Sequence, residues 1–229
     1  MMRLMDYQDR AKQAAALAEK VARGLNQALA ARGRATLCVP GGTTPGPFFE
    51  ALAATDLDWS AVTVVLGDER WVPVDHERSN ARLLRETLLT GKAAAARFIP
   101  FHRPVETPEE GLDEVAAVLS AEALPLDILV LGMGTDMHTA SIFPGADRLD
   151  EALDPEGTAP ILPLRAPGAP EPRVTLTLSA LLTARETHVL ITGEAKRAAL
   201  GTAMEDGPET EAPIRAILRR AAPAIHYAP

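Results

Sequence analysis

The sequence of 229 residues predicts an α/β fold, in which helices cover both faces of a doubly wound, mostly parallel sheet. Three observations support this prediction. Short apolar runs alternate along the chain with amphipathic segments of helical period. The runs are too apolar for half-exposed strands, which is typical of strands buried between two layers of helices. Several of them end in glycine-rich turns that lead toward the next helix. We expect residues 1–229 to form a single domain of this class.

The first half of the chain begins with a long predicted helix. Over residues 6–32, apolar side chains recur every three or four positions, which predicts one amphipathic helix ending near Gly33. Residues 35–40 (ATLCVP) predict a buried strand. The segment GGTTP then supplies turn residues, a hydroxyl candidate for the N-cap and a proline suited to a first helical turn. The elements predicted next are a helix at 45–54, a strand at 62–66, and helices at 79–89 and 107–123.

The second half continues the alternation. A strand is predicted at 126–131, and residues 144–172 are rich in Pro, Gly, Ala and acidic residues, which predicts loops. Further strands are expected at 173–178 and 187–192, further helices at 194–204 and 211–221, and a last edge strand at 224–227. Doubly wound sheets bind ligands beyond the C-terminal ends of their strands, so functional residues are expected there.

The composition excludes several classes of protein. The 23 Lys and Arg against 31 Asp and Glu give a net charge of −8, which argues against a nucleic-acid partner. The apolar stretches are far below the roughly 18 to 20 residues of a membrane span, so no membrane partner is expected. The N-terminus MMRLMDYQDRAKQ lacks the apolar core of a signal peptide, and Cys38 has no cysteine partner. A cytoplasmic protein is therefore expected, as a monomer or a homodimer.

Four clusters of candidate functional residues fall at strand ends. The first is Gly41-Gly42-Thr43-Thr44, between a predicted strand and a helix. Glycines let the backbone approach an anion, and free N–H groups at a helix N-terminus favour phosphate. The loop is no P-loop, because GKS or GKT is missing. It either binds a phosphate or sugar, or it is an ordinary turn without a ligand.

The second cluster, GDERWVP, directly follows the predicted strand at 62–66. Asp68, Glu69 and Arg70 form a surface ion-pair turn with Trp71 packed over it, or they face a substrate. In the second interpretation a carboxylate handles protons or hydroxyl groups, and Arg70 binds an anion or a developing oxyanion.

The third cluster, LGMGTDMHTAS, follows the predicted strand at 126–131. The third glycine of a dinucleotide fingerprint is missing, since Met137 occupies its place, so a nicotinamide site is not expected. Asp136 and His138 remain, two residues apart on a glycine-rich turn. A carboxylate beside a histidine can orient it and raise its basicity for activating water. The alternative is a helix cap formed by Asp136 beside a merely hydrogen-bonded His138.

The fourth group contains Arg173, at the head of a predicted strand, and Lys196, at a strand-to-helix turn. Either is a solvated surface charge or a ligand for phosphate. The remaining histidines show no metal-ligand spacing, so no metal is expected. The GxSxG motif of serine hydrolases is absent. Together the clusters offer a base, cations and a phosphate cradle, without an evident covalent nucleophile.

The motifs GGTTP, GDERWVP followed by SN, GMGTDMHTASIFPG, PRVTLT and TGEAK closely resemble the 6-phosphogluconolactonase family, and they span residues 40–196. The family shares a modified Rossmann-like fold with glucosamine-6-phosphate deaminases. Arg70 favours the lactonases, because deaminases carry a DEY-type sequence there, and Phe143 stands where deaminases place a glutamate. Met137 departs from the lactonase pattern, which usually has glycine. Since a non-glycine residue at positive φ costs roughly 1 to 2 kcal/mol, we expect the turn to differ locally.

The resemblance implies hydrolysis of 6-phospho-D-glucono-1,5-lactone to 6-phospho-D-gluconate, in the pentose phosphate pathway and without a cofactor. A lactone is an activated ester, so His138 can activate water directly and later protonate the ring oxygen. The resemblance implies that Asp136 orients or charge-stabilises His138. Arg70 stabilises the oxyanion or holds the substrate, and Asp68 binds sugar hydroxyls or orders its loop. The phosphate is assigned to Gly41, Gly42, Thr43, Thr44, Arg173 and Lys196. A deaminase and a non-catalytic sugar-phosphate sensor are the alternatives.

Overall fold

The computed structural model describes residues 2–229 and contains a parallel sheet of seven strands. In spatial order these are β1 (Arg3–Asp6), β10 (Ala224–Ala228), β9 (Glu186–Thr192), β6 (Ile128–Gly132), β2 (Ala35–Val39), β3 (Val62–Leu66) and β5 (Arg97–Ile99). All six neighbouring pairs are parallel. The predicted doubly wound sheet is therefore confirmed.

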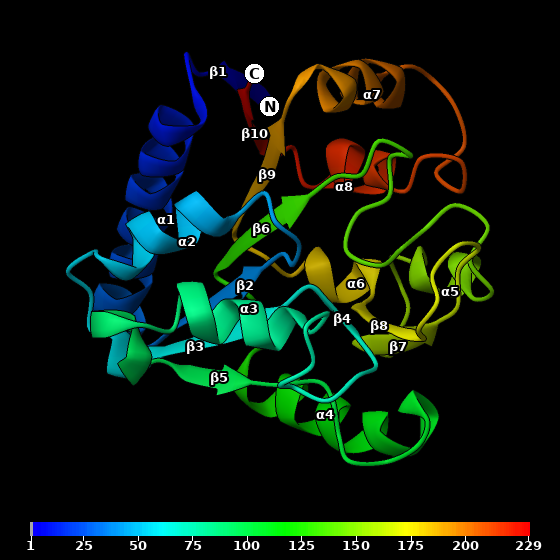
Figure 1. Ribbon diagram of the computed structural model, residues 1–229, viewed down its shortest axis with the longest axis horizontal. Coiled ribbons are helices and arrows are strands. Elements are labelled where there is room, and N and C mark those ends of the chain that lie inside the picture. The colour runs from blue at the N-terminus through cyan, green and yellow to red at the C-terminus, as the bar shows by residue number, and fades with distance from the viewer. Residues whose placement is uncertain (1) are drawn as a thin grey trace.

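Helices cover both faces of this sheet, as the direction of the chain requires. From β1 to β5 the chain moves toward one edge, and from β6 to β10 it moves toward the other. Because such crossovers are right-handed, the two series of helices lie on opposite faces. Figure 1 shows α1 and α2 on one side and α7 and α8 on the other. The helices are α1 (Arg10–Arg32), α2 (Gly46–Ala53), α3 (Asn80–Thr87), α4 (Pro108–Glu122), α5 (Leu149–Ala152), α6 (Leu178–Leu181), α7 (Glu194–Met204) and α8 (Ile214–Arg220).

Local capping explains the bounds of α1. The Asp9 side chain accepts a hydrogen bond from the Lys12 N–H at 2.8 Å, so the helix begins at Arg10 and not at residue 6 as predicted. The helix ends where predicted, because Gly33 takes the left-handed conformation with φ 69°. The N-cap expected from a hydroxyl before α2 is wrong, since no side chain caps that helix.

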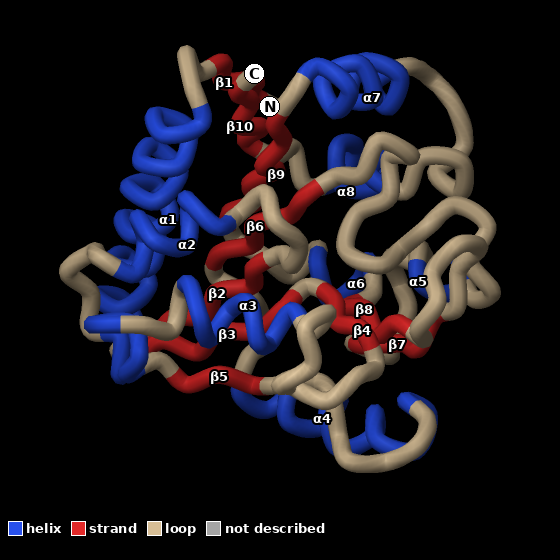
Figure 2. The backbone as a smooth tube through the Cα atoms, in the orientation of Figure 1, coloured by secondary structure: helices blue, strands red, loops and turns tan. Residues whose placement is uncertain are grey.

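A second sheet corrects part of the sequence prediction. It is antiparallel and has the order β4 (Asp68–Arg70), β8 (Arg173–Leu176) and β7 (Ile161–Leu164). The strand predicted at 173–178 is thus shorter and outside the main sheet. The region 144–172 is mostly loop, as Figure 2 shows, but it also contains α5 and β7. Gly67 joins the two sheets, because its N–H donates to Val39 O at 2.9 Å and its C=O accepts from Leu176 N–H at 2.9 Å.

Two strands of the main sheet, β1 and β5, were missed by the sequence prediction. They have four and three residues and lie at the two edges of the sheet. The predicted helix at 211–221 is also shorter, since α8 begins at Ile214. Strands this short have too few positions for a local pattern, and they are held by partners distant in sequence.

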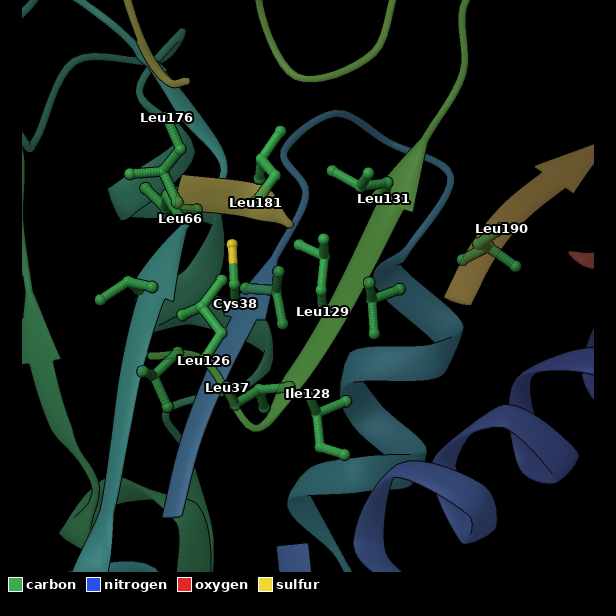
Figure 3. Packing of buried hydrophobic residues seen from close by; sticks show 14 of the residues in the cluster. Leu37, Cys38, Leu66, Leu126, Ile128, Leu129, Leu131, Leu176, Leu181 and Leu190 are labelled. Carbon is green, nitrogen blue, oxygen red and sulfur yellow. The ribbon is translucent and has the colours of Figure 1, made fainter. Parts of the chain in front are cut away.

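The core lies between the main sheet and its helices. Cys38 is fully buried on β2, and Figure 3 shows it among leucines of β2 and of the neighbouring strand β6, including Leu37 and Leu129. Burial raises the pKa of the Cys38 thiol, with a smaller contribution from the charge of Asp68. Cys38 is thus an apolar residue of a buried strand. No helix within residues 2–229 has the length and apolar character needed to cross a membrane.

A row of polar side chains crosses the core at β9 and β10. The Tyr7 hydroxyl lies 2.9 Å from His226 Nδ1, and His226 Nε2 lies 3.1 Å from His188 Nδ1. His188 Nε2 in turn lies 3.1 Å from Glu186 Oε1. Both histidines are fully buried. If Tyr7 donates to His226 Nδ1, the neutral His226 can donate from Nε2 to His188 Nδ1, which leaves the proton of His188 on Nε2, near the Glu186 carboxylate.

Candidate active site

A cavity of about 400 Å³ lies at the C-terminal ends of β2, β3 and β6, beside the start of α7. The chain order reverses here, since β3 lies on one side of β2 and β6 on the other. Such a point is the usual ligand site of a doubly wound sheet. Every predicted site residue except Asp136 lines the cavity, namely Gly41, Gly42, Thr43, Thr44, Asp68, Arg70, His138, Arg173 and Lys196.

Asp136 and His138 form a hydrogen-bonded pair on the turn after β6. His138 Nδ1 lies 2.5 Å from Asp136 Oδ1, and the His138 backbone N–H donates to the same oxygen at 3.3 Å. The bond from His138 lowers the pKa of the Asp136 carboxyl, although partial burial opposes this effect. The next helix begins only at Leu149, so the interpretation of Asp136 as a helix cap is wrong. Because Nδ1 is engaged, Nε2 is the ring nitrogen left to accept a proton.

Gly134 makes room for this pair. A Cβ atom at Gly134 would lie 2.3 Å from His138 Nδ1 and 2.4 Å from Asp136 Oδ1. The Gly134 N–H donates to His138 O at 3.0 Å, which closes the turn. The Phe143 ring centroid lies 4.2 Å from that of the imidazole. The imidazole thus contacts an aromatic ring and lies where a side chain at position 134 would clash with it.

Met137, between the two members of the pair, adopts the left-handed conformation with φ 65°. Its N–H donates to Gly134 O at 3.0 Å, and its C=O accepts from Ile214 N–H at 3.1 Å. Its half-buried side chain packs against the core. These contacts oppose the cost of positive φ, which is about 1 to 2 kcal/mol for a residue with a side chain. The methionine is therefore held in the conformation that glycine would adopt freely.

The glycine loop between β2 and α2 offers free backbone donors to the cavity. Within residues 2–229, the N–H groups of Gly42, Thr43 and Thr44 donate to no protein acceptor. Gly42 needs its glycine because its φ is 83°. Gly41 needs it because a Cβ there would lie 2.1 Å from the Asn80 side-chain amide. Unpaired N–H groups beside a helix N-terminus suit an anion such as phosphate.

Asp68 is oriented by Ser141, although the two lie far apart in sequence. The Ser141 hydroxyl donates to Asp68 Oδ2 at 2.5 Å, and Asn80 Nδ2 donates to the Asp68 backbone C=O at 2.9 Å. Asp68 is buried but lines the cavity. Its other carboxylate oxygen accepts no bond from the described residues, so it is available to a ligand hydroxyl.

Glu69, in contrast, has a structural role. Its carboxylate accepts hydrogen bonds from the backbone N–H groups of Asn80 at 2.8 Å and Ala81 at 2.7 Å, and from the Ser79 hydroxyl at 3.1 Å. Burial raises the pKa of the Glu69 carboxyl, and these backbone donors oppose the rise. Glu69 thus holds the N-terminus of α3 against β4.

Two arginines face each other across the small sheet. Arg70 on β4 pairs in register with Arg173 on β8. Each has a buried Nε without a hydrogen-bond partner in the described part of the chain. The Arg173 guanidinium lies 5.7 Å from the Phe143 ring centroid. Burial lowers the pKa of Arg173, and the neighbouring Arg70 charge lowers it further. Two adjacent cations with free donors suit an anion.

Lys196 completes the cationic side of the cavity. It is the third residue of α7, and the helix directly follows Gly193, whose φ is 85°. The side chain is half-buried, and burial lowers the pKa of its ammonium group. A helix N-terminus and an ammonium group both favour a bound anion. No three His, Cys, Asp or Glu side chains within residues 2–229 are grouped as a metal site.

Sequence reasoning missed four residues that shape the cavity, namely Asn80, Gly134, Ser141 and Phe143. Asn80 and Phe143 line it, and Ser141 holds Asp68. All four belong to motifs that the sequence analysis quoted, so position within the motif was the available signal. What the sequence could not give is the pairing of Ser141 with Asp68, which depends on the fold.

Comparisons with known proteins show the family of this chain. The family model described as glucosamine-6-phosphate isomerases/6-phosphogluconolactonase matches residues 8–226. A 6-phosphogluconolactonase of Rhizobium meliloti is 48% identical over 218 residues, covering 94% of each chain. One of Pseudomonas aeruginosa is 47% identical, covering 96% of this chain and 92% of that one.

Solved structures give the same result. The crystal structure of a 6-phosphogluconolactonase from Shewanella baltica matches with a TM-score of 0.95 and 36% identity, covering 100% of this chain and 97% of that one. A monomeric glucosamine-6-phosphate deaminase matches with a TM-score of 0.80 but only 17% identity, which shows a shared fold alone. From the matched length and these identities, the chain belongs to the glucosamine-6-phosphate isomerase/6-phosphogluconolactonase family.

Proposed function

We propose that this protein hydrolyses 6-phospho-D-glucono-1,5-lactone to 6-phospho-D-gluconate. The observation that carries the proposal is the Asp136–His138 pair, which lies beside a cavity lined by Arg70, Arg173 and Lys196. A base and a cluster of cations match an ester that carries a phosphate. The relatives named 6-phosphogluconolactonase, at up to 48% identity over nearly the whole chain, support the same reaction.

In the proposed mechanism, water attacks the lactone carbonyl carbon while His138 Nε2 takes a proton from it. The carbonyl oxygen becomes an oxyanion, and the Asp136 carboxylate stabilises the imidazolium. Collapse of the intermediate breaks the bond between C1 and the ring oxygen. The imidazolium returns its proton to that oxygen, and the acid product ionises. A general base of this kind contributes about 10² to 10⁴ in rate, so no covalent intermediate is needed.

The other site residues are proposed to bind the substrate. The phosphate is bound by the N–H groups and hydroxyls of the loop Gly41-Gly42-Thr43-Thr44, by Arg173 and by Lys196. The carboxylate oxygen of Asp68 that Ser141 does not bind accepts a hydrogen bond from a sugar hydroxyl. Arg70 either stabilises the oxyanion or holds the substrate, and its free Nε is the donor for either role.

We further propose that residues 1–229 form one domain, because hydrophobic residues of both sheets belong to one core cluster. We propose a cytoplasmic enzyme that needs no cofactor and acts as a monomer or a homodimer. Activity that persists after exhaustive chelation would support the cofactor-free mechanism, and a loss restored by only one metal would contradict it.

The proposal is tested by acid release from freshly generated 6-phosphogluconolactone, with chelator present and the uncatalysed rate subtracted. We expect strong acceleration by the wild-type protein and a drop of about 10² or more in kcat for His138→Asn. His102→Asn, which changes a histidine outside the cavity, is the matched control and should stay near wild type. A folded wild-type protein without acceleration refutes the proposal. Ammonia release from glucosamine 6-phosphate would then indicate a deaminase, and binding without turnover a sensor.

A further inference from the structure

Arg215, on α8, lies outside the cavity but is connected to two of its sides. It is only 5% exposed, and it forms no ion pair with any described residue. A buried guanidinium without a carboxylate partner is costly unless its donors are satisfied in another way. The groups that accept hydrogen bonds from the Arg215 guanidinium therefore indicate its role.

All three donor groups of the Arg215 guanidinium bind backbone carbonyls. Nη2 donates to Thr202 O at 3.0 Å and Nε to Ala203 O at 3.2 Å, in the last turn of α7. Nη1 donates to Pro208 O at 3.0 Å, in the loop between the helices. A cation on the last carbonyls of a helix also interacts favourably with its dipole. Arg215 thus fixes the C-terminus of the helix whose first turn carries Lys196.

The loop between α7 and α8 is shaped around this guanidinium. A Cβ atom at Gly207 would lie 2.5 Å from Arg215 Nη1 and 2.8 Å from Cζ. Only glycine therefore fits at this position while the guanidinium keeps its place. The arrangement is a built contact between two helices, not an incidental surface interaction.

The residue before Arg215 makes the second connection. Ile214, the first residue of α8, donates its backbone N–H to Met137 O at 3.1 Å. Met137 lies between Asp136 and His138 and holds a left-handed conformation. Two consecutive residues of α8 therefore bind the helix of Lys196 and the turn of His138.

We infer that Arg215 is a positioning residue, which sets the place of Lys196 relative to the Asp136–His138 pair. This inference rests on the proposed function, in which Lys196 binds the substrate phosphate and His138 activates water. If α7 shifts, a phosphate held by Lys196 carries the lactone carbon away from His138 Nε2. A misplacement of about 1 Å can cost about 100-fold in rate, so a residue remote from the substrate can matter.

The test compares Arg215→Met with Arg220→Met. The control removes the same charge from the same helix, but Arg220 binds Glu209 and not α7. We expect Arg215→Met to raise KM and to lower kcat/KM for the lactone by about 10-fold or more, at a temperature where the variant is folded. Arg215→Lys should recover part of the loss, and Arg220→Met should stay within about 2-fold of wild type. If Arg215→Met does not fold, Gly207→Ala replaces it in the test, because a Cβ atom at Gly207 would displace the same guanidinium.

Repeating the Arg215→Met substitution in the Lys196→Ala variant separates a positioning role of Arg215 from a contribution to stability alone. In Lys196→Ala, the increase in KM caused by Arg215→Met should disappear, because the phosphate contact it positions is gone. A lower melting temperature with unchanged kcat and KM would overturn the inference, as would an equal KM increase in both backgrounds. If the wild-type protein shows no turnover, the proposed function fails, and titration with 6-phosphogluconate decides the inference. A Kd at least 10-fold weaker for Arg215→Met supports it, and an equal Kd overturns it.

Discussion

Acidification should destabilise this protein through the buried His226. Burial lowers the pKa of His226 to about 3, with smaller contributions from the charges of His188 and Lys20. In the unfolded chain a histidine titrates near 6.5. Between these values the unfolded chain binds a proton that the folded protein does not, so the free energy of unfolding falls as the pH falls. Above about pH 6.5, His226 makes no such difference.

The size of the effect follows from the same values. One proton bound only by the unfolded chain costs about 1.4 kcal/mol of stability per pH unit. From pH 7.5 to pH 4.5 this amounts to nearly 3 kcal/mol, a large fraction of the roughly 5 to 15 kcal/mol typical of a domain. The loss would continue toward pH 3, where the folded protein also takes up the proton.

Urea denaturation between pH 7.5 and 4.5, at constant ionic strength, measures this dependence. His226→Gln removes the titrating group but keeps polar atoms beside Tyr7 and His188. We expect its stability to be lower than wild type at pH 7.5 and the difference to shrink steadily below pH 6.5. His76→Gln, at an exposed position, is the control and should keep the wild-type slope. An equal slope for wild type and His226→Gln would refute the reasoning.

Three further predictions concern the cavity. Gly134→Ala should lower kcat by about 100-fold, because a Cβ atom would lie 2.3 Å from His138 Nδ1 and displace the imidazole. Steady-state kinetics measure kcat, and circular dichroism checks that the variant stays folded. Asp136→Asn should lower kcat by about 10² or more, since the imidazolium loses its carboxylate, and an unchanged kcat would exclude that role. Lys196→Ala and Arg173→Ala should raise KM for the phosphorylated lactone but not for unphosphorylated gluconolactone. Equal effects on both substrates would exclude a phosphate contact.

The sequence predicted the parallel sheet and the cavity residues because both depend on local signals. Strands such as Val62–Leu66 are continuous apolar runs, and the glycine and charged clusters directly follow them. Since all strands of such a sheet end on the same side, residues at the ends of different strands meet there. Eight of the nine cavity residues were thereby placed together without knowledge of the contacts between them, and Arg173 is the exception.

What the sequence could not predict depends on pairing between distant segments. The strand β1 exists because it pairs with β10, more than 200 residues later. Arg173 was expected to begin a strand of the main sheet, but pairing with β4 places it in the small sheet opposite Arg70. Arg215 gave no signal, because its partners are backbone carbonyls that no motif encodes.

The register of the small sheet has a thermodynamic consequence. Like charges on directly opposed residues repel, so the pairing of Arg70 with Arg173 works against the fold of the protein alone. An anionic ligand that binds both guanidiniums relieves this repulsion, and part of its binding free energy is recovered as fold stability. Ligand affinity and thermal stability should therefore rise and fall together: phosphorylated sugars raise the melting temperature, and added salt weakens that effect by screening. Because of this arginine pair, the melting temperature of the protein is expected to report how tightly an anionic ligand is bound.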